Sequence, residues 1–215
     1  MRNIKWKVAQ FLEIRWWKRY LKKQKKEYYQ KKKEYWLSYL SKLELNYEEI
    51  KNERILDAGC GPVGIFIAFD GADITAVDPL LEQYEENLTH FSKADFPKTT
   101  FVKSRVEDYF SQQKFTYTFC LNVINHVSDI RAAVDALVEN TTTGGKVTIS
   151  IDCHRNGLLK KIFQFLGFDA LHPYQYSAQD YIKLFTSNNT LHLEKKQILK
   201  NGKIFDYVAF VFIKK

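Results

Sequence analysis

Three glycines and two acidic residues have the types and spacing that could do chemistry. The segment ILDAGCGPVG contains Gly59, Gly61 and Gly64 in a GxGxxG pattern directly after a short apolar run. Asp57 precedes the glycines, and Asp78 ends the next apolar run. Glycines permit a sharp turn and let a ligand approach the backbone, while a carboxylate at the second strand can accept both hydroxyls of a ribose. The pattern indicates a nucleoside ligand, and a turn that only packs a helix on a strand is the alternative.

The position of Asp57 separates two classes of nucleoside ligand. A dinucleotide would place its pyrophosphate at this loop, where the carboxylate of Asp57 would repel it. A ligand with a positive ammonium or sulfonium group beside its ribose suits an acid at this place. We therefore expect a cationic cofactor rather than NAD.

Five segments, in this order, resemble the class I S-adenosylmethionine-dependent methyltransferases. ILDAGCGPVG is similar to their first motif, ITAVDP to the acidic second strand, VEDY to the loop beside adenine, FCLNVINHVSD to the fourth strand and its turn, and LVENTTTGGKVTISI to the helix, turn and fifth strand. The likeness runs from about Arg54 to the C-terminus and includes a closing antiparallel hairpin. It implies the fold and the cofactor S-adenosyl-L-methionine, but it does not identify the methyl acceptor.

The resemblance also implies contacts to the cofactor. Asp57, Gly59 and Gly61 would surround the methionine part, and Asn122 would lie beside its end. Asp78 would hold the ribose, and Val106 and Glu107 would line the adenine. Arg105 stands where many relatives have an acid, which puts the contact to the adenine amino group in doubt. The full implied set is Asp57, Gly59, Cys60, Gly61, Asp78, Pro79, Val106, Glu107 and Asn122.

The methyl acceptor would be held by residues at the ends of the later strands. Methyl transfer from a sulfonium is an in-line displacement, so a base is needed only when the acceptor must lose a proton. His126 closely follows the fourth strand and is the candidate catalytic base, with ordering of its turn as the alternative. Candidate acceptor contacts, or ordinary loop residues, are His154, His172, Tyr174 and Tyr176.

The segment 155–177 interrupts the alternation of strands and helices and reads as a cover over the acceptor. Its apolar side chains favour an apolar, aromatic or lipid-like acceptor, and core packing is the alternative; they are Phe163, Phe165, Leu166 and Phe168. We expect an enzyme that methylates an oxygen or nitrogen atom of a small molecule. An RNA methyltransferase and a non-catalytic cofactor-binding scaffold stay open as alternatives.

The elements that must position these residues alternate between strand and helix from Arg54 onward. Strands are expected in RILDAG, DITAVD, TTFVKS, YTFCLN and GKVTISID, with helices beginning in GIFIAF, LLEQYEENLTHF and DIRAAVDALVENT. Asn201-Gly202 joins two last strands as a hairpin. The expected fold is α/β, with a doubly wound, mostly parallel seven-stranded sheet and an antiparallel C-terminal hairpin.

The N-terminal 45 residues are expected to form a basic, aromatic, helical extension, with the methyltransferase domain over residues 46–215. Residues 1–35 contain thirteen Lys or Arg and three Glu, a net charge of +10, so the remainder carries −2 of the total of +8. All four tryptophans lie in this extension. A basic helix with tryptophans can dock on an anionic membrane, on a second copy of the chain or on nucleic acid, and the acidic remainder weighs against nucleic acid as substrate. The alternative is that aromatic side chains pack the extension onto the domain or its twin, with the lysines in solvent; these are Trp16, Trp17, Tyr20 and Trp36.

Composition excludes several classes of protein. No apolar run is long enough to span a bilayer, and the N-terminus lacks the apolar core of a secretion signal. The three cysteines are widely spaced and form no CxxC pair, so neither a disulfide framework nor a zinc site is expected. We expect a cytoplasmic protein without a metal, with a peripheral position at the inner face of a membrane left open.

Overall fold

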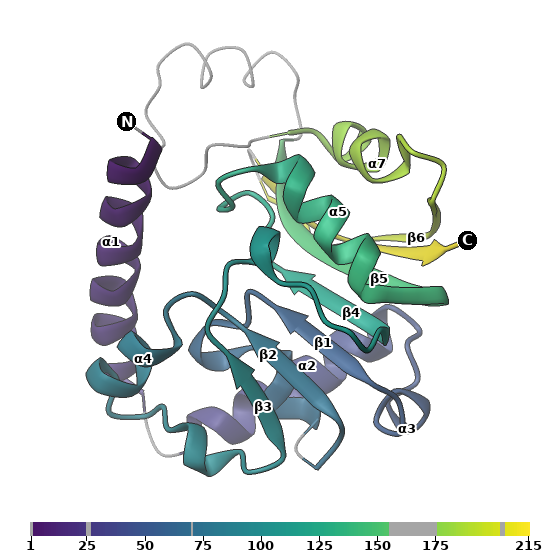
Figure 1. Cartoon of the computed structure of the whole chain (residues 1–215). Helices are drawn as coiled ribbons and strands as arrows, with labels where there is room; N and C mark the ends of the chain where they lie inside the picture. Colours follow the sequence, from purple (N-terminus) through teal and green to yellow (C-terminus); the bar gives the residue numbers. More distant parts are fainter. Residues whose placement is uncertain (1, 25–26, 70, 155–175, 203–204) are drawn as a thin grey trace.

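The protein is built around one sheet (Figure 1). The computed structural model describes residues 2–24, 27–69, 71–154, 176–202 and 205–215, with side chains from residue 10 onward. Among these residues a seven-stranded sheet has the order β3-β2-β1-β4-β5-β7-β6. The strands are β1 (Ile55–Ala58), β2 (Ile74–Val77), β3 (Thr99–Val102), β4 (Phe115–Leu121), β5 (Thr141–His154), β6 (Leu191–Lys200) and β7 (Phe205–Lys214).

The strand directions confirm the expected fold class. Strands β1 to β5 pair in parallel, whereas β7 pairs antiparallel with both β5 and β6. The order reverses between β1 and β4, and ligands of open α/β sheets bind in the crevice at such a switch point, beyond the carboxyl ends of the strands. The fold therefore places the ends of β1, β2 and β4 where a cofactor is expected.

Helices cover both faces of the sheet. Figure 1 shows α5 and α7 over one face, α2 over the other, and α1 beside α4 at one side of the molecule. The helices are α1 (Arg2–Lys22), α2 (Tyr28–Lys42), α3 (Tyr47–Ile50), α4 (Leu81–Asn87), α5 (Ile130–Asn140) and α7 (Ala178–Thr186). Short 3-10 turns are η1 (Gly61–Val63), η2 (Ile65–Phe69), η3 (Lys93–Asp95) and η4 (Val106–Asp108).

The segment after the glycine loop differs from the sequence expectation. An α-helix was expected to begin in GIFIAF, but the chain forms η1 and η2. All five side chains of η2 are buried, so the segment lacks the exposed polar face of a surface helix. Packing into the core therefore decides its conformation.

The N-terminal segment forms two helices that belong to the core. α1 ends at Lys22 and α2 begins at Tyr28, and the Lys-rich sequence between them has no apolar side chain to bury. Trp36 of α2 is buried, and its indole Nε1 donates to the carbonyl oxygen of Val63 at 3.0 Å. α2 shares a buried cluster with β1 and β2, so it packs as part of the sheet domain. The expected domain boundary near residue 45 stays a prediction.

Candidate active site

The glycine loop makes its turn with backbone that favours glycine. Gly59 and Gly61 have φ angles of +77° and +55°. The backbone N–H groups of Gly59 and Cys60 donate to the carbonyl oxygen of Val77 at 2.7 and 3.0 Å. A Cβ atom on Gly59 would lie 2.4 Å from Cγ1 of Val123. The loop is thus packed tightly between the ends of β2 and β4.

Asp57 holds this loop from within. Its Oδ2 accepts the backbone N–H of Phe66 at 3.0 Å, and the residue is 2% exposed. Burial raises the pKa of Asp57 to about 7, while the hydrogen bonds from Phe66 and Ile65 lower it in part. The carboxyl group therefore organises the start of η2, and its expected contact to the methionine part of a cofactor stays a prediction.

Asp78 links the second strand to the glycine loop. Its Oδ2 accepts the N–H of Gly61 at 2.9 Å and its Oδ1 accepts the N–H of Leu80 at 2.8 Å. Burial, followed by the nearby charge of Glu13, raises the pKa of Asp78 to about 7. This carboxyl group lies directly beside Gly61, which is the position expected of a ribose-binding acid.

Helix α1 adds residues to this site that sequence reasoning missed. The hydroxyl of Tyr84 in α4 donates to Oε1 of Glu13 at 2.8 Å. Trp17, one turn farther along α1, is the nearest side chain to Gly61: its Cζ2 lies 4.0 Å from where a Cβ would stand. Burial raises the pKa of Glu13, and hydrogen bonds from Tyr84 and Trp17 oppose that rise. The helix therefore lies against the glycine loop at Gly61, beside Asp78.

The residues expected beside adenine form a buried turn. Val106 and Glu107 begin η4 and are 5% and 8% exposed. Oε1 of Glu107 accepts both the backbone N–H and the hydroxyl of Ser128, at 3.0 and 2.6 Å. Arg105, in the place where many relatives have an acid, pairs with Asp108 at 2.5 Å. These contacts join the loop after β3 to the start of α5, and the adenine contact stays a prediction.

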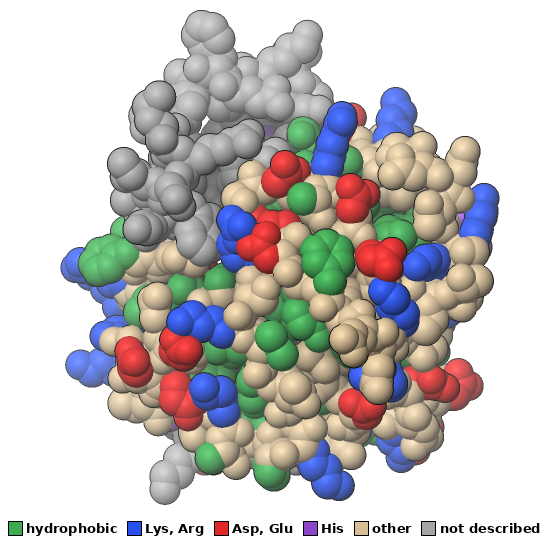
Figure 2. All heavy atoms as spheres, in the orientation of Figure 1, with side chains coloured by type: hydrophobic (Ala, Val, Ile, Leu, Met, Phe, Trp, Pro, Cys, Tyr) green, Lys and Arg blue, Asp and Glu red, His purple; other side chains and the backbone are tan. Residues whose placement is uncertain are grey.

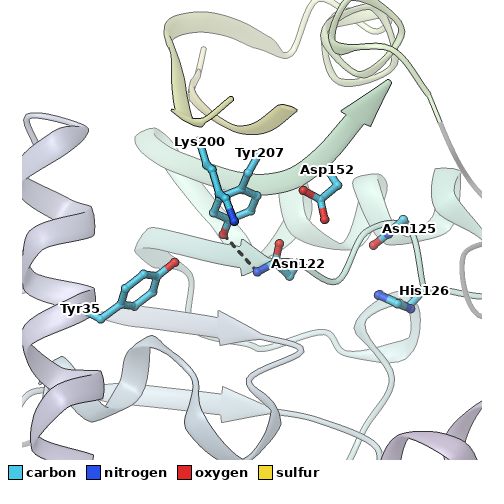
Figure 3. A pocket seen from close by; sticks show the side chains of 7 residues that line it. All are labelled: Tyr35, Asn122, Asn125, His126, Asp152, Lys200 and Tyr207. Atoms are coloured by element: carbon cyan, nitrogen blue, oxygen red, sulfur yellow. Dashed lines mark hydrogen bonds between the residues drawn. The ribbon is translucent and has the colours of Figure 1, made fainter. Parts of the chain in front are cut away.

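A pocket of about 300 Å³ opens beyond the carboxyl ends of β4 and β5 (Figure 3). Asn122 comes from the end of β4, Asn125 and His126 from the turn after it, and Asp152 from β5. The helix α2 and the C-terminal hairpin close the other side. The lining residues are Tyr35, Asn122, Asn125, His126, Asp152, Lys200 and Tyr207. Of the residues predicted for the acceptor side, this pocket contains His126, with Asn122 from the cofactor set beside it.

A hydrogen-bonded group fixes one wall of the pocket. Asn122, in the left-handed region at φ +60°, donates from Nδ2 to the hydroxyl of Tyr207 at 3.1 Å. The same hydroxyl shares a hydrogen bond of 2.7 Å with Oγ of Ser150. Burial and the neighbouring Tyr35 raise the pKa of Tyr207, so it stays protonated at neutral pH. Tyr207 therefore acts as a fixed hydrogen-bonding group and not as a base.

The opposite wall presents groups that accept hydrogen bonds. Oδ1 of Asn125 is buried without a hydrogen-bond partner among the described residues, and Figure 3 shows it turned toward the pocket. The carboxylate of Asp152 and the ring of His126 line the same side (Figure 3). Since a buried oxygen without a partner costs free energy, this wall suits a ligand that carries a hydroxyl or amine donor.

Two of the other predicted acceptor contacts, His154 and Tyr176, are described by the structure and lie outside the pocket lining. His154 ends β5, is buried, and packs its ring 4.5 Å from that of Phe205, outside the pocket lining. The carbonyl oxygen of Tyr176 accepts the backbone N–H of His154 at 3.3 Å, and the ring of Tyr176 packs against that of Tyr181. His172, Tyr174 and the apolar part of the expected cover, residues 163–168, lie outside the described residues.

Several lining residues carried no signal in the sequence. Tyr35, Lys200 and Tyr207 lie far from the motifs in sequence. They line the pocket because Tyr35 comes from α2, and Lys200 and Tyr207 come from the hairpin whose strand β7 pairs with β5. Asn125 lies next to His126 within a segment that resembles the family, and Asp152 is the last residue of the expected strand GKVTISID. Polar residues at the ends of two neighbouring parallel strands could have identified these two.

The sequence profile of a methyltransferase domain family matches residues 24–190. This chain is a class I S-adenosylmethionine-dependent methyltransferase. The match begins near the start of α2, which agrees with the packing of that helix into the core.

Individual relatives resemble parts of this methyltransferase. The ubiquinone biosynthesis O-methyltransferase of Rickettsia typhi is 28% identical over 113 residues, which cover 52% of this chain and 46% of the relative. The chain thus spans about half the length of such curated relatives. The YcgJ protein of Bacillus subtilis has a TM-score of 0.62 at 17% identity, covering 81% of this chain and 98% of that one.

A second solved structure holds the cofactor product. The 1,6-didemethyltoxoflavin-N1-methyltransferase of Burkholderia thailandensis, with bound S-adenosylhomocysteine, has a TM-score of 0.56 at 15% identity and covers 81% and 76% of the two chains. Within the described residues no cluster of His, Cys, Asp or Glu could hold a metal ion. None of the described helices of this methyltransferase is long and apolar enough to cross a membrane.

Proposed function

We propose that this methyltransferase moves a methyl group from S-adenosylmethionine to an oxygen or nitrogen atom of a small acceptor held in the pocket beyond β4 and β5. The observation that carries the proposal is the unpartnered Oδ1 of Asn125, which faces this pocket beside His126 and Asp152. An acceptor hydroxyl or amine would supply the missing donor. The tight contact between Gly59 and Val123 joins the pocket to the cofactor loop.

The charges around the loop fit a cationic cofactor. Burial raises the pKa values of Asp57, Asp78 and Glu13, and the charges of Glu13 and Asp57 raise that of Asp78 further. Nearby negative charges attract a cation, and the sulfonium and ammonium groups of S-adenosylmethionine are cationic. When bound, this cofactor supplies an electrophilic methyl group.

The chain would bind the cofactor from two directions. Asp78 would accept the ribose hydroxyls, while Gly59 and Gly61 let the ligand approach the backbone. From α1, Trp17 would cover the ribose, since it lies against Gly61, and Glu13 would face it beside Asp78, since it accepts the hydroxyl of Tyr84. Such a cover excludes water from the reacting groups.

The reaction needs alignment and, for a hydroxyl acceptor, removal of one proton. The acceptor oxygen attacks the methyl carbon as the carbon–sulfur bond breaks, and the sulfur keeps the electron pair. The hydroxyl proton would pass to the ring of His126, which lines the pocket with Asp152. Asn125 would hold the acceptor through its Oδ1, and Tyr207 would fix Asn122 beside the transferred methyl.

The acceptor would have a polar reacting end and an apolar remainder. The described lining is polar, which suits the reacting end. The apolar remainder would meet the expected cover at 155–177, which stays a prediction. Oxygen is the preferred target, because the curated relatives that match this chain are described as O-methyltransferases.

A panel of small phenols, catechols and amines tests the acceptor site. We expect methylated product by mass spectrometry from at least one hydroxyl compound, with a loss of turnover of about a hundredfold or more in His126→Gln. His192→Gln is the matched control, because His192 is exposed on β6. Equal turnover in the His126 and His192 variants would exclude His126 as the base.

A further inference from the structure

The outward side of α1 carries a surface that the methyltransferase site does not use. The described residues leave six large hydrophobic side chains exposed, and three of them lie within six positions of α1. These are Phe11, Leu12 and Trp16, with exposed fractions of 62%, 41% and 54%. Water-exposed aromatic and aliphatic side chains gathered on one helix indicate an interaction surface.

Positive charges surround these hydrophobic side chains. Arg15, Lys18, Arg19, Lys22 and Lys23 are all exposed, and none of the five pairs with an acid among the described residues. Figure 2 shows Lys and Arg side chains beside exposed hydrophobic ones along the edge of the molecule where α1 lies. We define the docking face as these five cations together with Phe11, Leu12 and Trp16.

The inward side of the same helix is already occupied. Ile14 and Leu21 are buried in the core, and Glu13 and Trp17 face α4 and the glycine loop. The docking face therefore lies on the side of α1 that is turned away from the domain. Its side chains are free to contact something outside the chain.

We propose that the docking face binds the surface of an anionic lipid bilayer. Cations near such a surface are attracted to the headgroups, and tryptophan favours the headgroup level. A second copy of this chain fits poorly, because a two-fold contact would bring the five cations of one copy against those of the other. RNA fits less well, because Leu12 offers no ring on which a base can stack.

Vesicle sedimentation of the full chain tests this proposal. We expect binding to vesicles of phosphatidylcholine with about 30% phosphatidylglycerol to be at least about tenfold tighter than to phosphatidylcholine alone, and to weaken at high salt. Arg15→Gln with Lys18→Gln and Arg19→Gln should reduce the binding by about tenfold or more. Lys98→Gln with Arg131→Gln and Lys183→Gln removes three exposed cations elsewhere and should change it little.

The apolar part of the docking face has its own matched control. Phe11→Ser with Trp16→Ser should weaken binding to the anionic vesicles, while Phe110→Ser with Ile198→Ser should not, since Phe110 and Ile198 are exposed elsewhere at 59% and 44%. Equal binding to neutral and anionic vesicles would overturn the proposal. A second result would also overturn it: the wild type binds no vesicles, and light scattering shows a dimer that dissociates in the Phe11→Ser, Trp16→Ser variant.

Discussion

The hydroxyl of Tyr84 donates to the carboxylate of Glu13 across 71 positions of sequence, at 2.8 Å. This bond joins α1 to α4 at the place where Asp78 and Gly61 meet. A helix that was predicted from sequence as a basic extension thereby lies against the proposed cofactor site.

Trp17 should contribute to cofactor binding. Its ring covers Gly61, and an aromatic contact of this kind contributes about 1 kcal/mol or more, so Trp17→Ala should weaken the affinity for S-adenosylmethionine by about fivefold or more. Phe11→Ala is the matched control, because Phe11 lies on the same helix and is 62% exposed. Isothermal titration calorimetry compares the two. Tighter binding in Trp17→Ala would mean that this ring obstructs the site rather than covering it.

Gly59 should tolerate no side chain. Gly59→Ala adds a Cβ at 2.4 Å from Val123 and also strains a φ of +77°, so we expect the free energy of unfolding to fall by about 2 kcal/mol or more and cofactor binding to be lost.

Gly144→Ala is the control for strain alone. Its φ is +78°, but a Cβ there meets nothing within 4 Å, so the cost should be about 1 kcal/mol with cofactor binding retained. Urea denaturation measures both variants. Equal losses of stability would show that the contact with Val123 adds nothing to the strain.

The stability of the cofactor-free protein should fall as the pH rises. The pKa values of Asp57 and Asp78 are raised from 3.8 to about 7, so between these values the folded chain binds more protons than the unfolded chain. The stabilisation that comes from protonated Asp57 and Asp78 is fully present below pH 4 and is lost as the pH rises through 7. We expect Tm to decrease by several degrees between pH 5 and 8, with a smaller slope in Asp57→Asn. An unchanged slope in that variant would assign the effect to other groups.

The same titration should change cofactor affinity in the opposite direction. A carboxylate accepts the two ribose hydroxyls better than a protonated carboxyl group does, so affinity should increase from pH 6 to pH 8 as Asp78 loses its proton. Asp78→Asn should bind more weakly and show little dependence on pH. A parallel pH dependence in both proteins would contradict the role given to Asp78.

Tyr207 should position the acceptor side. Tyr207→Phe removes the hydrogen bonds to Asn122 and Ser150, so we expect the KM for the acceptor to rise by about tenfold while cofactor affinity changes little. Tyr117→Phe is the control, because Tyr117 lies near the start of β4, away from the pocket. Steady-state kinetics separates KM from kcat. An unchanged KM would remove Tyr207 from the acceptor site.

The sheet and the order of its elements could be predicted from sequence, because turns and strands are determined by glycines, acids and apolar runs that lie close together along the chain. The antiparallel hairpin followed from Asn201-Gly202 in the same way. The conformation of η2 did not follow, because complete burial of Ile65 to Phe69 decides it. The same limit applies to the site: Asp78 and His126 lie beside motifs, whereas Trp17 and Tyr207 reach the site through packing between distant segments.

Isotope-labelled S-adenosylmethionine tests the central claim most directly. The chain and its Asp78→Ala variant are each incubated with cell extract and cofactor carrying a labelled methyl group, and lipid, small-molecule and RNA fractions are analysed by mass spectrometry. We expect a labelled small or lipid-like compound with the wild type and none with the variant. Label in RNA alone, or cofactor binding by the wild type without any labelled product, would contradict it.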